Sequence, residues 1–374
     1  ANNRHLIFGA QGLSRLFWLK ILICVGFISS ILLSLHLWVG ERSFPLVPVI
    51  DNIALSIIIE SLVFVCLLLG LLGSIIYPRS RKYLILSIIS IAVLAFFFFF
   101  RWQPRAYQYT FILVALSAVN WEKGDGSGYT ALNISRIIFV SIFIWSGIQK
   151  INPAFFDQVY PWLSQPVLEV TPEILHGFIS KMGYLVPFME IFIGIGLLVE
   201  SLRKYALIIS VAMLGFLLFV LGPLGYNWNS VVWPWDIVMT LGVFILFYKA
   251  NRFSLIQGVL KPKLNYQKLV VILFIVMPAF SFFNAWDSYL SFALYSGNTH
   301  GGQVVSEGEF GRTDISAWAF DELNVPAYPE TRIFKSIARS MCRTSMDSQL
   351  TLYVEGKPTV FNPGNGGVYT CEEL

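Results

Sequence analysis

The run NIALSIIIESLVFVCLLLGLLGSII at residues 52–76 decides the fold class of this chain. Its one ionisable side chain is Glu60, and the rest of the run is almost entirely apolar. A helix needs roughly 20 such residues to cross the hydrocarbon core of a bilayer, whereas an isolated strand would leave its backbone polar groups unpaired there. The run therefore predicts a transmembrane helix.

Similar apolar runs recur along the sequence. Charged residues make up only 13% of the chain, against about 25% in a typical soluble domain. These features together predict an all-α polytopic membrane protein with about nine transmembrane helices. We expect the helices near residues 16–39, 52–76, 83–100, 106–121, 134–150, 184–200, 205–222, 231–249 and 267–287.

The distribution of Lys and Arg predicts how these helices are oriented. The loop after the second run carries Arg79 and Lys82, and the loop after the sixth carries Arg203 and Lys204. Residues 222–233, between the seventh and eighth runs, carry none. Basic residues concentrate in cytoplasmic loops. We therefore expect a protein of the bacterial cytoplasmic (inner) membrane, with its N-terminus in the cytoplasm and its C-terminus on the periplasmic or extracellular side.

The change in composition near residue 290 predicts two domains. Residues 1–289 are expected to form the transmembrane domain, and residues 290–374 a small extracytoplasmic α+β domain. Hydrophobic periodicity and turn residues predict its elements. These are a helix over residues 328–341 and strands over residues 349–354, 359–361 and 368–371.

A long segment at residues 151–183 separates the fifth and sixth runs and is expected to lie at the outer membrane interface. Thr171 and Pro172 are typical of a helix start and predict a short helix over residues 172–182. Pro161 and Pro166 are expected to break the chain before that helix.

Cys342 and Cys371 are the only cysteines in the C-terminal domain. The predicted topology places both in an oxidising compartment, where a cysteine pair favours a disulfide bond. The alternative is two free thiols.

Several kinds of site are not indicated by the sequence. The four histidines are dispersed, and with the cysteines they form no metal-ligand spacing. No Gly-rich nucleotide-binding motif and no GxSxG motif occurs. The net charge of +4 is spread over the loops. We therefore predict no metal site and no nucleic-acid partner.

Three acidic residues fall inside the apolar runs: Glu60, Glu190 and Asp236. Ionisable groups in a membrane are costly, so they either pair with a partner that fixes helix packing or line a functional cavity. Pairing with arginine is the favoured interpretation for Glu60. For Glu190 and Asp236 both interpretations stay open.

Three basic residues fall at the predicted outer ends of the runs: Arg101, Arg105 and Lys150. A long basic side chain at a helix end usually reaches out to the polar interface, which is the expected behaviour of Arg101. Lys150 has a second interpretation, because a desolvated lysine can lose its proton and act as a base.

Two motifs resemble segments of a known superfamily. Ser146-Gly-Ile-Gln-Lys150-Ile-Asn, and the stretch Trp102-Gln-Pro-Arg105-Ala-Tyr107-Gln-Tyr109, are similar to the HTTM proteins. These include vitamin K-dependent γ-carboxylase and are grouped with DoxX-like membrane proteins. Within this resemblance, Lys150 corresponds to the lysine that deprotonates vitamin K hydroquinone, and Arg105 stands in place of a histidine. Arginine stays charged and would bind an anion instead.

Two functions follow as expectations. In the first, an outer-leaflet cavity binds a quinone-like or lipid ligand, with Lys150 and Arg105 in catalytic roles. The expected ligand-binding residues are Trp102, Tyr107, Tyr109, Trp145, Glu190, Asn229 and Asp236. In the second, the chain is a non-catalytic accessory or assembly subunit that docks a membrane or periplasmic protein through residues 290–374. The sequence leaves open whether the protein is an enzyme.

Overall fold

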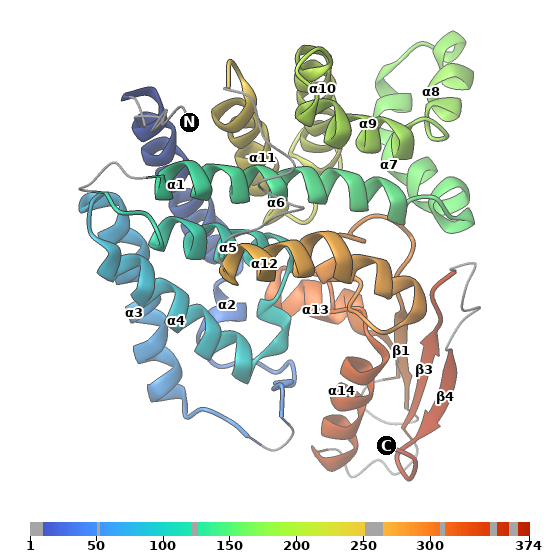
Figure 1. The fold of residues 1–374 in the computed structure, drawn as a ribbon. Helices are drawn as coiled ribbons and strands as arrows, with labels where there is room; N and C mark the ends of the chain where they lie inside the picture. Colours follow the sequence, from blue (N-terminus) through green and yellow to red (C-terminus); the bar gives the residue numbers. More distant parts are fainter. Residues whose placement is uncertain are drawn as a thin grey trace.

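Helices formed by the apolar runs make up most of the structure (Figure 1). The computed structural model describes residues 10–50, 53–121, 126–250, 265–306, 311–344, 350–358 and 366–374. The main helices are α1 (Ala10–Leu33), α2 (Leu35–Trp38), α3 (Ile57–Ile76), α4 (Arg81–Phe97), α5 (Pro104–Ser117), α6 (Ser127–Gln149), α9 (Val186–Leu198), α10 (Arg203–Leu221) and α11 (Val232–Phe247). The last run continues from α12 (Asn265–Val271) through a π turn (Ile272–Val276) into a 3-10 helix (Met277–Phe283).

The number of helices long enough to cross a bilayer is smaller than the predicted number of crossings. Within the described ranges, five helices are long and apolar enough to cross a bilayer: Gly12–Leu33, Ile57–Ile76, Ser127–Gln149, Arg203–Leu221 and Asn265–Phe283. The pair Glu173–Met182 and Val186–Leu198, bent by 58°, makes a sixth if it counts as one crossing.

The chain is thus a multi-pass membrane protein, but nine crossings are not confirmed. Helices α4, α5, α9 and α11 have 17, 14, 13 and 16 residues, whereas a crossing takes about 20.

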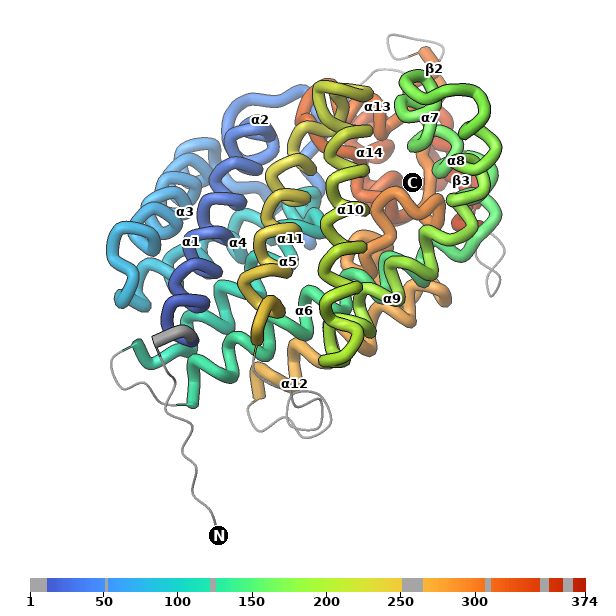
Figure 2. The backbone as a smooth tube through the Cα atoms, turned by 90° about the horizontal axis from the view of Figure 1, so that it is seen from above, coloured from blue at the N-terminus to red at the C-terminus, as the bar shows by residue number. Residues whose placement is uncertain are grey.

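The helices pack side by side with their apolar faces together. Figure 2 shows α11 between α1 and α10, with α9 beyond α10, and each of these neighbours is in contact. Between α6 and α9 the approach is especially close. A Cβ added at Gly194 of α9 would lie 2.4 Å from Ile144 Cγ1 of α6. Small residues allow such approaches in membrane helices.

The segment after α6 is helical through most of its length. It contains a π turn (Phe155–Val159), α7 (Tyr160–Val170), a 3-10 turn (Glu173–Leu175) and α8 (His176–Met182). The short helix predicted over residues 172–182 is present as the last two of these.

The predicted break at Pro161 and Pro166 is wrong. Pro161 occupies the first turn of α7, where its missing N–H costs nothing. Pro166 lies inside the helix and leaves the carbonyl of Trp162 without its usual donor. The hydroxyl of Tyr226 donates to that carbonyl at 2.6 Å, so the helix continues.

A four-stranded antiparallel sheet lies near the C-terminus. Its strands are β1 (Gly301–Val305), β2 (Arg312–Asp314), β3 (Thr351–Glu355) and β4 (Gly367–Thr370), in the order β2-β1-β3-β4. Two helices accompany the sheet, α13 (Ile315–Leu323) and α14 (Thr331–Thr344). Ring atoms of Phe334 on α14 lie so close over Gly302 of β1 that a Cβ there would be 2.8 Å away.

The predictions for this region are confirmed in part. The predicted helix is α14, and the strands over residues 349–354 and 368–371 are β3 and β4. The strand predicted over residues 359–361 lies outside the described residues. Strands β1 and β2 and helix α13 were not predicted, because their short segments carry little hydrophobic alternation.

Cys342 and Cys371 form the predicted disulfide bond. Their sulfur atoms are 2.00 Å apart and their Cα atoms 5.8 Å apart. The bond connects the end of α14 to the residue after β4, and it excludes the alternative of two free thiols.

Glu60 is paired with arginine, as expected because an unpaired charged group inside a membrane is costly. Its carboxylate accepts hydrogen bonds from Arg42 Nη2 at 2.8 and 2.9 Å, and from Arg101 Nη2. The prediction that Arg101 reaches out to the polar interface is wrong. Its side chain is fully buried, because Glu60 and the carbonyls of Leu37 and Trp38 accept its hydrogen bonds.

Candidate ligand-binding site

Lys150 and Glu190 form an ion pair inside the helical domain. Lys150 ends α6 and Glu190 lies in α9. Lys150 Nζ is 3.0 Å from Glu190 Oε2, and it donates to Ser146 Oγ at 2.6 Å. The two side chains are 7% and 4% exposed. The structure therefore brings together two residues that the sequence marks separately.

Close helix packing makes this ion pair possible. A Cβ added at Gly147 would lie 2.5 Å from the carbonyl oxygen of Pro187, one turn before Glu190. Glycine at this position lets α9 approach the end of α6. Since Lys150 follows Gly147 by three residues, the same approach sets its ammonium beside the carboxylate.

The ion pair lies in the wall of a pocket of about 860 Å³, a volume that includes its opening. Its polar lining residues are Ser146, Lys150, Tyr160, Glu190, Asp236 and Tyr295. The apolar lining residues are Ile142, Phe143, Phe155, Leu163, Val186, Met213, Leu214, Phe216, Leu217, Val232, Trp235, Met239, Phe292 and Leu294. Apolar pockets with a few convergent polar groups are typical of small-molecule sites.

Asp236 of α11 faces the same pocket from another side. It is 4% exposed, and its Oδ2 has no hydrogen-bond partner among the described residues. The nearby Thr240 hydroxyl donates to the backbone carbonyl of Asp236 at 2.8 Å rather than to its carboxyl group. A buried acceptor without a donor is costly.

Arg105, Tyr109 and Asn229 are not among the lining residues but lie near Tyr295, which is. Asn229 Nδ2 donates to the hydroxyl oxygen of Tyr295. Tyr295 and Tyr109 each lie within electrostatic range of both Arg105 and Asp236. Arg105 is 4% exposed. Three of the predicted site residues thus lie behind the pocket wall.

The remaining predicted residues lie elsewhere. Trp102 and Tyr107 line a different hollow, beside Trp286 and Arg332. Tyr107 stacks on Phe274 with ring centroids 4.6 Å apart. Trp145 packs against the core and is not part of the pocket lining.

Sequence reasoning missed Tyr160, Trp235 and Tyr295 as pocket residues. Trp235 donates its ring N–H to Gln108 Oε1 at 2.6 Å, which fixes the indole in the wall. In the sequence, Trp235 could have been identified as a pocket residue because it adjoins Asp236. Tyr295 gave no signal, because it belongs to the polar C-terminal sequence.

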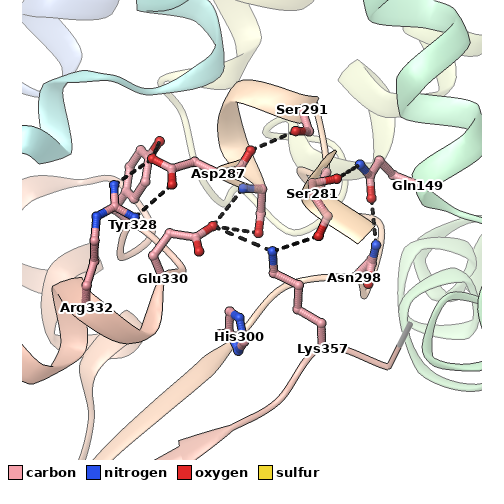
Figure 3. A network of polar contacts seen from close by, with 12 residues as sticks. Gln149, Ser281, Asp287, Ser291, Asn298, His300, Tyr328, Glu330, Arg332 and Lys357 are labelled. Carbon is pink, nitrogen blue, oxygen red and sulfur yellow. Dashed lines mark hydrogen bonds and ion pairs between the residues drawn. The ribbon is translucent and has the colours of Figure 1, made fainter. Parts of the chain in front are cut away.

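A polar network joins the end of α6 to the C-terminal region (Figure 3). Gln149 Nε2 donates to Ser281 Oγ at 2.7 Å, and Asn298 Nδ2 donates to Gln149 Oε1 at 2.6 Å. Lys357 is 1% exposed. Its Nζ donates to the Ser281 carbonyl at 3.5 Å and lies 3.9 Å from Glu330 Oε1.

Charges in this network balance. Burial raises the pKa of Glu330 and lowers the pKa of Lys357. Burial, together with the nearby Lys357 charge, lowers the pKa of His300 to about 4, so this histidine is neutral at pH 7. Arg332 binds Asp287 through two hydrogen bonds of 2.8 and 2.7 Å. The network therefore holds two cations and two anions, and its contacts through Lys357 and Ser281 connect the segment after β3 to Gln149 at the end of α6.

The described residues do not form a metal-binding cluster. In the part of the chain that the structure describes, no group of three His, Cys, Asp or Glu side chains is placed to hold a metal ion.

Residues 129–230 match the family model of methylamine utilisation protein MauE. The match covers less than half of the 374-residue chain. No curated protein and no solved structure matches the chain. Most of the pocket lining, including Lys150 and Glu190, falls within the matched segment.

The resemblance to the HTTM and DoxX-like proteins is wrong. The family match is to MauE, and it covers the Lys150 motif on which that resemblance depended. The motif is a few polar residues at the end of an apolar helix, a pattern that many membrane proteins share. The roles that the resemblance implied for Lys150 and Arg105 no longer have a basis in it.

Proposed function

We propose that this membrane protein binds an amphiphilic, lipid-like molecule in the pocket between α6, α7, α9, α10 and α11. The single observation that carries the proposal is a buried Lys150–Glu190 ion pair set in a mostly apolar pocket. The apolar walls would hold the body of the ligand, and the ion pair would meet its head group. The agreement between the pocket lining and the MauE-like segment supports this location.

Binding suits the contacts of Lys150 better than proton abstraction. An ammonium group has three N–H donors. Lys150 uses them for Ser146 Oγ, for Glu190 Oε2 and, at 3.4 Å, for the Ser146 carbonyl, so a ligand atom would displace only the longest of the three bonds. An ammonium held in this way is a head-group contact rather than a base.

Photoaffinity labelling tests the proposal. The purified protein in nanodiscs is illuminated with a fatty alcohol that carries a diazirine, and the labelled peptides are mapped by mass spectrometry. We expect labels on peptides of α6, α10 and α11 that excess unlabelled dodecanol removes. Leu214→Trp fills the pocket and should abolish these labels, whereas Leu224→Trp, at a position 80% exposed, should not. Labelling of these peptides that is unchanged by excess dodecanol and by Leu214→Trp would contradict the proposal.

A second candidate is the non-catalytic accessory protein that docks a partner through residues 290–374. The exposed face of the sheet favours it. Tyr353 and Val368 are paired across β3 and β4 and are 45% and 57% exposed. Two large apolar side chains side by side on a polar domain suit a protein contact.

A further inference from the structure

The Asp236 carboxyl group belongs to the pocket wall, and the ligand-binding proposal does not use it. Its Oδ2 faces no donor among the described residues. The side chain is 4% exposed, so bulk water does not compensate. A buried acceptor left in this state destabilises the protein. A ligand that supplies a donor removes that destabilisation.

Three donor groups of the pocket wall are engaged elsewhere, and no donor of the described residues is within hydrogen-bond distance of Oδ2. The ring N–H of Trp235 donates to Gln108, and the Thr240 hydroxyl donates to a backbone carbonyl. The Lys150 ammonium donates to Ser146 and Glu190. The pocket therefore contains an acceptor that its own lining does not satisfy.

The charged groups of the lining also favour a ligand that donates a hydrogen bond. The ionisable acids of the wall are Glu190 and Asp236, and its only ammonium is Lys150, already paired with Glu190. An ionised acidic head group only accepts hydrogen bonds, so it brings no donor for the unpartnered carboxyl oxygen. Arg105 would attract such a group, but it lies behind Tyr295 and is not part of the lining.

We propose that the pocket selects amphiphiles whose head group donates a hydrogen bond to Asp236, namely alcohols or primary amines, over amphiphiles with an acidic head group. This inference rests on the proposed ligand-binding function and adds the chemistry of the head group. The hydroxyl or amine N–H would donate to Oδ2, and the alkyl chain would lie against Leu214, Leu217 and Met239.

Competition against the diazirine alcohol tests the selectivity. Dodecanol, dodecylamine and dodecanoate share a chain length and differ in the head group. Leaving a buried acceptor unpaired costs about 1–3 kcal/mol, which is roughly fivefold to a hundredfold in affinity. We expect dodecanol or dodecylamine to remove the pocket labels at concentrations at least about fivefold lower than dodecanoate. A preference for the alcohol identifies a neutral donor, and a preference for the amine identifies a cationic one.

Asp236→Asn supplies the matched test, because it replaces the unpartnered oxygen by an N–H donor or a weaker acceptor. We expect the selectivity against dodecanoate to fall to less than about threefold. Asp321→Asn, an exposed acid on α13, should leave it unchanged.

The outcomes separate the two proposals. Equal or tighter binding of dodecanoate by the unaltered protein overturns the head-group inference, while the ligand-binding function stands. Failure of all three competitors to displace the label overturns the ligand-binding function itself. If Asp236→Asn does not fold, the order of the three competitors in the unaltered protein still decides.

Discussion

Glu60 forms ion pairs with two arginines that are buried with it. The side chains of Arg42 and Arg101 are 4% and 0% exposed, and that of Glu60 is 9% exposed. Removing one partner of a buried ion pair costs about 3–5 kcal/mol, because a charge remains without compensation. We expect Glu60→Gln to lower the free energy of unfolding by about 3 kcal/mol, measured by thermal unfolding in detergent. The exposed Glu41→Gln is the control, and equal stability of the two variants would contradict this role for Glu60.

Helix α8 presents large apolar side chains to its surroundings. Ile174, in the turn that leads into it, is 89% exposed, and Phe178 is 66% exposed. Water would make this costly, whereas the membrane interface would not. A nitroxide label at Ile174→Cys should collide more with oxygen than with a water-soluble nickel chelate in electron paramagnetic resonance. A label at Glu169→Cys, on the exposed end of α7, should show the reverse. Matching water accessibility at both sites would place α8 in solvent.

The elements differ in how far they could be predicted. Apolar runs predict helices well because length and composition are local properties, as α3 and α6 show. The continuity of α7 through Pro166 was not predictable, since it depends on Tyr226, a residue far along the chain. The sequence marks Lys150 and Glu190 individually. Their pairing depends on how two helices pack, and no local pattern encodes that packing.

At the scale of the whole molecule, the C-terminal sheet exposes one face at Tyr353 and Val368. If this face docks a partner, Tyr353→Asp together with Val368→Asp should remove that partner without loosening the domain, because both side chains point outward. The measurement is the mass of the purified complex by light scattering, with the Cys342–Cys371 bond checked by thiol titration. A partner that stays bound to the variant, or a solitary protein in both cases, would rule out docking through this face.

The residues that complete the pocket wall come from a part of the chain that follows the helices lining the rest of it. Phe292, Leu294 and Tyr295 line it, and Gln149 holds the following residues through Asn298. During synthesis, α6, α9, α10 and α11 emerge before these residues do. The pocket wall is therefore incomplete until residues 292–295 have been made and have packed against these helices. If the pocket binds a ligand as proposed, a ligand present during biogenesis can enter before this wall forms, whereas a later one must pass the completed wall.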